Sequence, residues 1–160
     1  MSTIRTLVLS CLVLSSVNLL KAQSEPRPTP LSPTPARVVG HASVRTVIFS
    51  DKPNLVEGRE FFRPNAVAID KSSTPHALYV SDSGNNRVLG WRNAASFANG
   101  APADIVVGQR DLLSTYPLGP GTTLSRGLNF PTGIAVDQEG NLYVVDAGNC
   151  RILRYPRPFD

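Results

Sequence analysis

Acidic and basic side chains recur in this sequence at a fixed spacing, and they could form either ion pairs or direct contacts with a ligand. Asp82 precedes Arg87 by five positions, and Asp146 precedes Arg151 by the same number. A carboxylate and a guanidinium that face each other across a short turn can form a two-pronged hydrogen-bonded pair. Because the arrangement is repeated, we interpret it as part of the structural framework of each repeat, with direct ligand contact as the alternative.

The same segments carry further repeated polar residues. Asn85 and Asn149 lie in the turns, where an asparagine can hydrogen-bond to the backbone or adopt a left-handed conformation. Asp70 and Asp137 recur at the ends of earlier segments, and paired carboxylates are a common device of acid–base catalysis. Since both are repeat positions in turns that end strands, we interpret them as structural too.

Few other residues suggest chemistry. His41 and His76 lie in unrelated contexts, no Cys and His spacing is typical of zinc, and neither a nucleophile elbow nor a phosphate loop is present. We therefore predict no catalytic residue, no metal ligand and no cofactor. The candidate binding residues are His76, Trp91 and Tyr155. The two rings close equivalent strands, where packing between sheets is the alternative.

These residues belong to two copies of one sequence pattern. Residues 64–70 (PNAVAID) match residues 131–137 (PTGIAVD), and residues 78–91 match residues 142–155. The first copy has the longer turn between its two blocks, and His76 lies in that turn.

Short apolar runs bounded by turn residues predict strands in each copy, and no stretch has a sustained helical period. Adjacent apolar residues such as Val144 and Val145 predict neighbours on both faces of each sheet. The predicted strands are 66–70, 78–82, 87–91 and 103–108 in the first copy and 133–137, 142–146 and 151–155 in the second. Four-stranded sheets stacked around an axis form a β-propeller, so we predict an all-β, partial propeller with an incomplete second blade.

The pattern resembles the NHL repeat. The first copy departs from it in having Ala66 in place of a glycine and a turn that includes Pro75 and His76. Residues 103–111 resemble the outer-strand segment that follows such repeats in exported bacterial proteins. The resemblance implies two blades, at about 61–108 and 128–160. The second copy carries the pattern throughout, at Pro131, Gly133, Asp137, Gly140, Asn141, Tyr143, Asp146, Asn149 and Arg151.

The start of the chain predicts export. Residues 1–22 combine an early arginine, an apolar run and a final small residue, which is the organisation of a signal peptide. The apolar run is shorter than the roughly 20 residues of a membrane-spanning helix, so no stable membrane insertion is predicted. Residues 23–35 are a proline-rich linker. We predict a secreted or periplasmic protein with a folded region at 36–160, which begins with a strand at 44–49.

The charge balance disfavours nucleic acid as a partner. The net charge is +4, but two of the 16 basic residues, Arg5 and Lys21, lie in the predicted leader. No cluster of Lys and Arg remains that could neutralise a row of phosphates. Cys150 has no disulfide partner in the predicted mature chain.

Two blades are too few to close a propeller, which needs about four to eight. We therefore expect either a fragment of a longer propeller or self-association through open blade edges. Our leading hypothesis for function is an exported scaffold that binds a protein, peptide or glycan. The alternative is a fragment of a propeller enzyme, a metal-dependent lyase or a lactonase-like hydrolase, with its active site in the missing blades.

Overall fold

A computed structural model describes residues 37–40, 56–118 and 126–160. The predicted signal peptide (1–22), the linker (23–35) and the predicted strand at 44–49 lie outside these ranges. Within them the regular elements are seven β-strands and two one-turn 3-10 helices, and no α-helix is present. The all-β prediction is confirmed.

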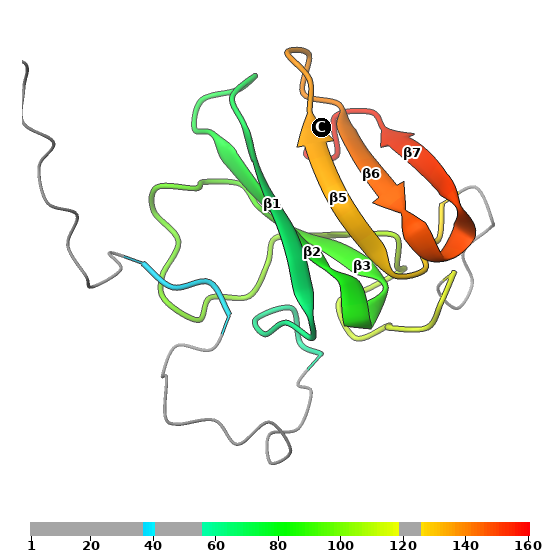
Figure 1. Cartoon of the computed structure of the whole chain (residues 1–160). Helices are drawn as coiled ribbons and strands as arrows, with labels where there is room; N and C mark the ends of the chain where they lie inside the picture. The colour runs from blue at the N-terminus through cyan, green and yellow to red at the C-terminus, as the bar shows by residue number, and fades with distance from the viewer. Residues whose placement is uncertain (1–36, 41–55, 119–125) are drawn as a thin grey trace, which may run out of the picture. The chain divides into compact units, whose positions relative to one another are not determined.

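The first copy of the repeat forms an antiparallel sheet of four strands in sequence order (Figure 1). The strands are β1 (Pro64–Asp70), β2 (Ala77–Asp82), β3 (Arg87–Trp91) and β4 (Ile105–Val107). β1 begins two residues earlier than predicted, at Pro64, where a residue without an N–H group does least harm. The outer strand β4 is shorter than predicted.

The second copy forms a three-stranded antiparallel sheet of β5 (Pro131–Val136), β6 (Leu142–Asp146) and β7 (Arg151–Tyr155). β5 ends one residue before the predicted Asp137, because the Asp137 N–H and C=O close the following turn with Asn141 and Gly140. Both sheets have an irregularity at the same place, early in their first strands. The two copies therefore share strand order and register.

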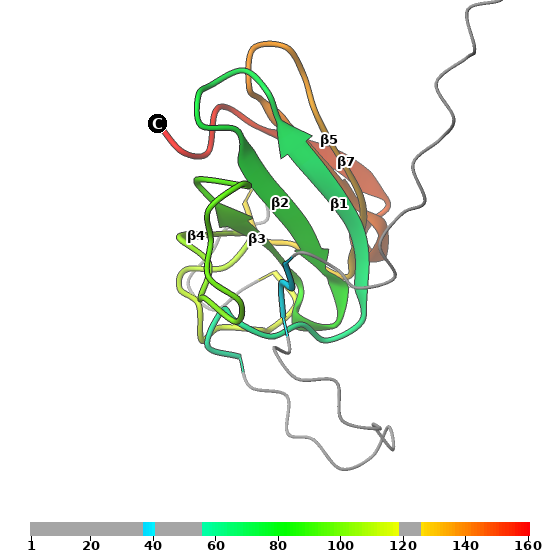
Figure 2. The same ribbon diagram turned by 90° about the vertical axis from the view of Figure 1, so that its left-hand side faces the viewer.

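The two sheets pack face to face around a shared hydrophobic core. β1 and β5 lie next to each other, as Figure 2 also shows. Tyr79 and Val88 of the first sheet are fully buried against Leu142 and Val144 of the second. Both are apolar on the faces that meet, which is why successive sheets stack instead of leaving one face in water. This is the arrangement of a partial β-propeller, as predicted, and we call the two sheets blade 1 and blade 2.

The other face of blade 1 is also covered. Leu78, Val80, Leu89 and Trp91 form a second core there. It is completed by residues that precede β1 or follow β3, namely Val39, Phe61, Ala94, Phe97 and Leu112, with Val106 of β4. Blade 1 therefore has apolar packing on both faces.

Candidate functional site

The repeated polar residues of blade 1 form a closed network around the carboxylate of Asp82. One oxygen accepts a hydrogen bond from the backbone N–H of Phe62 at 2.7 Å. The other accepts from Asn85 Nδ2 and from Arg87 Nε, each at 2.8 Å. The Asp82 and Arg87 side chains are fully buried. A buried carboxylate with three donors is satisfied and has little capacity left for a ligand.

Blade 2 repeats this network atom by atom. Asp146 accepts from the N–H of Asn129 at 2.7 Å, from Asn149 Nδ2 at 2.8 Å and from Arg151 Nε at 2.7 Å. The Asp146 carboxylate is fully buried, whereas the Arg151 side chain is 27% exposed. The same set of bonds therefore lies in a wetter environment in blade 2.

The ion pairs differ from the expected two-pronged geometry. Each arginine gives only its Nε to the carboxylate, and one of its other two nitrogens donates to neighbouring loops. Arg87 Nη1 donates to the carbonyl oxygens of Val56, at 2.8 Å, and Leu112. Arg151 Nη2 donates to the carbonyl of Gly127 at 2.8 Å. The arginines thus tie the segments that flank each blade to its second and third strands.

The turn between the paired residues is a one-turn 3-10 helix in both blades, Ser83–Asn85 and Ala147–Asn149. The left-handed positions are the residues that follow, Asn86 (φ 54°) and Cys150 (φ 52°), and not Asn85 and Asn149. Those two asparagines instead take the alternative role of hydrogen bonding: Asn85 donates to the Asp82 carboxylate and Asn149 to the Asp146 carboxylate.

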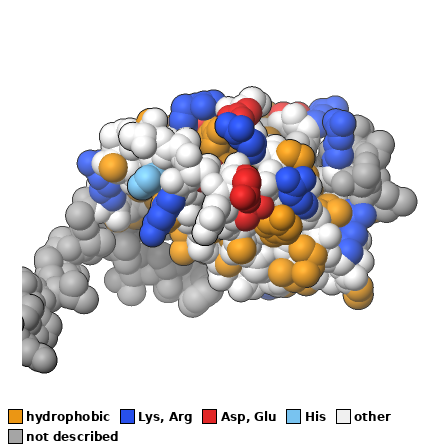
Figure 3. Space-filling model, turned by 90° about the horizontal axis from the view of Figure 1, so that it is seen from above, with side chains coloured by type: hydrophobic (Ala, Val, Ile, Leu, Met, Phe, Trp, Pro, Cys, Tyr) orange, Lys and Arg blue, Asp and Glu red, His pale blue; other side chains and the backbone are white. Residues whose placement is uncertain are grey.

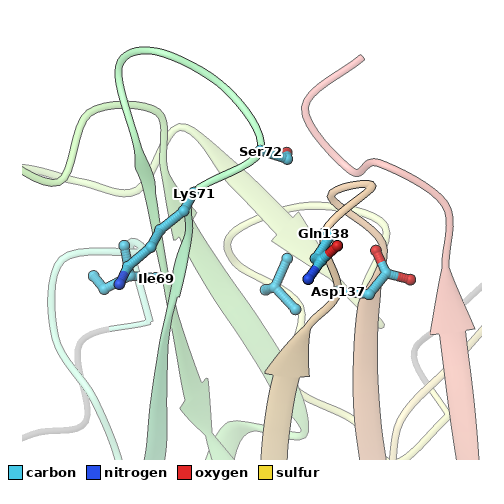
Figure 4. A pocket seen from close by; sticks show the side chains of 6 residues that line it. Ile69, Lys71, Ser72, Asp137 and Gln138 are labelled. Atoms are coloured by element: carbon cyan, nitrogen blue, oxygen red, sulfur yellow. The ribbon is translucent and has the colours of Figure 1, made fainter.

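A hollow lies where the innermost strands of the two blades end (Figure 4). Its volume is about 280 Å³, and its lining comes from both blades. Ile69, Lys71 and Ser72 belong to the end of β1 and its turn. Val136, Asp137 and Gln138 belong to the end of β5 and its turn. An apolar wall with polar groups above it is typical of a recognition site.

Two acidic residues near this hollow are already used by the turns. The Asp137 carboxylate accepts from the backbone N–H of Glu139 at 3.1 Å and of Asn141 at 2.8 Å, and Asn141 Nδ2 also donates to it. Burial raises the pKa of Asp137, but the hydrogen bonds from Asn141, Tyr143 and Glu139 outweigh it, so the pKa lies below its usual value. Asp70 accepts from the N–H and Oγ of Ser72, at 2.8 and 2.6 Å.

Lys71 and Gln138 are therefore the polar side chains of the hollow that the turns leave for a ligand. Both are exposed, and they line the hollow from different blades. In Figure 4 the Lys71 side chain lies alongside Ile69, and Gln138 lies beside Asp137. Sequence reasoning missed them. The length of the turn after the first strand could have pointed to them. Lys71 and Gln138 both lie in this turn, and it is longer in the first copy than in the second.

The three predicted binding residues lie in three different settings. His76 is exposed at the end of the β1–β2 turn, with Nδ1 at 2.9 Å from the carbonyl of Ser73. Trp91 is 2% exposed, in the core on the outer side of blade 1, next to Phe61 and Phe97. Tyr155 packs into the core between the blades.

Both rings keep a polar partner. Trp91 Nε1 donates to the carbonyl of Ala101 at 3.3 Å, and Trp91 also lines a hollow of about 400 Å³ with residues of the β3–β4 loop. The Tyr155 hydroxyl donates to the carbonyl of Arg126 at 2.7 Å, and burial raises its pKa to about 12. Because the two rings belong to different cores, the structure does not bring them together into one site.

The described residues contain no group of three or more His, Cys, Asp or Glu side chains placed to hold a metal ion. In the same part of the chain, no helix is long and apolar enough to cross a membrane.

Comparison with known families agrees with the fold. Residues 128–155 match the family model described as the NHL repeat. This span contains the three strands of blade 2 and the Asp146 network. No curated protein matches the chain. The match and the paired blades together show an NHL repeat within a partial β-propeller.

Proposed function

We propose that this chain is an exported recognition scaffold, which binds a protein or peptide at the ends of β1 and β5. The proposal is supported by a contrast between the two blades: they share a buried polar network, but their turns above the hollow differ. The buried network around Asp82 recurs around Asp146 with equivalent partners, at 2.7 to 2.8 Å in both blades. The turns above the hollow differ in length and in side chains.

The hollow suggests the chemistry of the ligand. Ile69 is 42% exposed, and Val136 forms the matching wall from blade 2. An apolar side chain of a partner would bury there, and its removal from water favours binding. Lys71 supplies a positive charge and Gln138 an amide, which suit a carboxylate and a backbone amide. We therefore propose an extended peptide segment with an apolar residue beside an acidic one.

The predicted export would put the partner outside the cytoplasm. The signal-like residues 1–22 would direct the chain across a membrane, and the composition of residues 23–35 is that of a linker. The enzyme alternative stays a prediction, and no feature of the hollow favours it. Metal analysis of the purified protein and a screen for lyase and lactonase turnover would test that alternative.

A turn exchange tests the proposal with the least damage to the fold. Residues 71–76 are replaced by residues 138–140, because blade 2 demonstrates that this shorter turn joins strands of the same register. The full chain and the exchanged chain are then compared on an array of peptides and glycans. We expect peptides bound by the parent to be lost from the exchanged chain. Unchanged binding, or hits that are only glycans, would contradict the proposal.

A charge reversal refines the test. Lys71→Glu should weaken an acidic peptide hit from the array at least about tenfold, which corresponds to about 1.4 kcal/mol. Arg110→Glu is the matched control, because Arg110 is an exposed basic residue that does not line the hollow. Equal effects of the two changes would point to general charge attraction and not to a site at Lys71.

A further inference from the structure

The outward face of blade 2 has exposed side chains, whereas the equivalent face of blade 1 is buried against blade 2. Tyr79, Ser81 and Val88 of blade 1 are fully buried beneath blade 2. The equivalent positions in blade 2 are Tyr143, Val145 and Ile152. Val145 is 38% exposed and Ile152 is 66% exposed, and they are cross-strand neighbours on β6 and β7. Figure 3 shows hydrophobic side chains gathered on the right-hand side, where Figure 1 places the second sheet.

Blade 1 holds its neighbour with polar groups as well as apolar ones. Ser81 Oγ donates to the carbonyl of Thr132 at 3.0 Å, and Ser83 Oγ donates to the carbonyl of Pro131. Asn86 Oδ1 accepts from the N–H of Phe130 at 2.8 Å. These bonds fix one blade to the next in a defined direction.

Blade 2 lacks these groups on its open face. Val145, Ala147 and Cys150 occupy the positions of Ser81, Ser83 and Asn86. The open face is thus more apolar than its buried counterpart, and it has lost the donors that would match the first strand of another blade. Two apolar surfaces can pack together without matched hydrogen-bond donors and acceptors. Such a face therefore suits a partner that presents the same apolar surface.

The chain's own segments oppose a head-to-tail arrangement of copies. Blade 2 covers blade 1 with Leu142, Val144 and Leu153. The equivalent face of blade 1 is already covered by Val39, Phe61 and their neighbours. A second copy therefore finds most of that face occupied. Among the described residues of β1, the apolar side chains of Val67 and Ile69 are exposed there.

We propose that two copies of this chain associate through the outward faces of β6 and β7, in a two-fold arrangement that packs Val145 and Ile152 of each copy against the other. Two-fold dimers are the commonest symmetric assemblies, and their interface uses the same surface patch twice. Arg154, which shares this face, is exposed. Its aliphatic stem can cover apolar surface while the guanidinium stays in water. The inference is independent of the proposed ligand site.

Sedimentation velocity of the full chain over a concentration series tests this, in reducing buffer so that Cys150 forms no disulfide. We expect a reversible monomer–dimer equilibrium. Ile152→Arg and, separately, Val145→Arg should raise the dissociation constant at least about tenfold. Val67→Arg and Leu113→Arg are matched controls, because both replace an exposed apolar residue outside the proposed interface. Both should leave the equilibrium unchanged, and thermal melts confirm that each variant is folded.

The outcomes separate the possible occupants of this face. A wild-type chain that stays monomeric at its highest soluble concentration overturns the proposal, as does a folded Ile152→Arg variant that still dimerises. Loss of association in Val67→Arg, restored by mixing it with Ile152→Arg, would reveal head-to-tail packing and also overturn the two-fold arrangement. Growth beyond dimers would do the same.

Discussion

Blade 1 and blade 2 have the same framework but different surroundings. Blade 1 is covered on both faces, by blade 2 on one side and by its own flanking segments on the other. Blade 2 is covered on one face. The Asp82–Arg87 pair is accordingly fully buried, whereas Arg151 in the equivalent pair keeps contact with water. Hydrogen bonds with the same geometry therefore contribute differently to stability, according to how deeply the surrounding packing buries them.

The largest expected effect comes from breaking the buried ion pair. Asp82→Ala leaves the Arg87 guanidinium without its counter-charge inside the core, which should cost about 3–5 kcal/mol. Asp146→Ala should cost less, because water can reach Arg151. Urea denaturation of both variants measures the difference in the free energy of unfolding. Equal losses in the two variants would break the comparison between the blades.

Gly84 and Gly148, which lie in the 3-10 turns of the two blades, should respond alike to substitution, because each lies close to an equivalent backbone carbonyl. A Cβ atom at Gly84 would lie 2.7 Å from the carbonyl oxygen of Phe62, and one at Gly148 would lie 2.7 Å from that of Asn129. These are backbone atoms that also receive the glycine N–H. Gly84→Ala and Gly148→Ala should each lower stability by about 1–3 kcal/mol in the same denaturation assay. A substitution at either position that leaves stability unchanged would contradict this close approach of the backbone to both glycines.

A smaller contrast concerns two tyrosines of the core between the blades. Tyr155→Phe removes the hydrogen bond to Arg126 and should cost about 0.5–1.5 kcal/mol. The Tyr79 hydroxyl is buried and has no hydrogen-bond partner among the described residues. Tyr79→Phe should therefore be neutral or stabilising. Thermal melts of the two variants give the comparison, and a destabilised Tyr79→Phe variant would show that this hydroxyl has a partner.

The smallest expected effect is a pH dependence in the turn of blade 2. The folded-state pKa of Asp137 lies below its ordinary value of 3.8. A lowered folded-state pKa gives stability that is complete above the unfolded value and is lost as the pH falls through the folded value. Asp137→Asn should therefore flatten the acid limb of a stability–pH curve. An unchanged acid limb would mean that the turn's hydrogen bonds do not favour the charged carboxylate.

Much of the fold was predictable, because the same pattern of apolar runs and turn residues occurs in both copies of the repeat. β3, β6 and β7 have the predicted bounds. In each blade an aspartate ends the second strand and an arginine begins the third, so the turn between these strands could be located in the sequence. β1 and β5 begin earlier than predicted, because the irregularity after their prolines hides those first residues from the alternating pattern. The roles of Asn86 and Cys150 were missed, because the sequence does not reveal which residue of a turn is left-handed.

The candidate site was less predictable. Sequence reasoning singled out the rings of Trp91 and Tyr155, which lie in two different cores. It passed over Lys71 and Gln138, because the hollow that both residues line depends on how one blade packs against the next. Contacts between sheets carry no local sequence pattern, so only the stacked arrangement brings the two turns together.

The central claim is that two copies of one module pack face to face. Methyl–methyl nuclear Overhauser effects on the full chain test it most directly, with labelled Val and Leu. We expect cross-peaks between methyl groups of Val88 and Val107 in blade 1 and those of Leu142 and Val144 in blade 2, which share one core. Cross-peaks confined to each sheet, with none between the two sets, would contradict it.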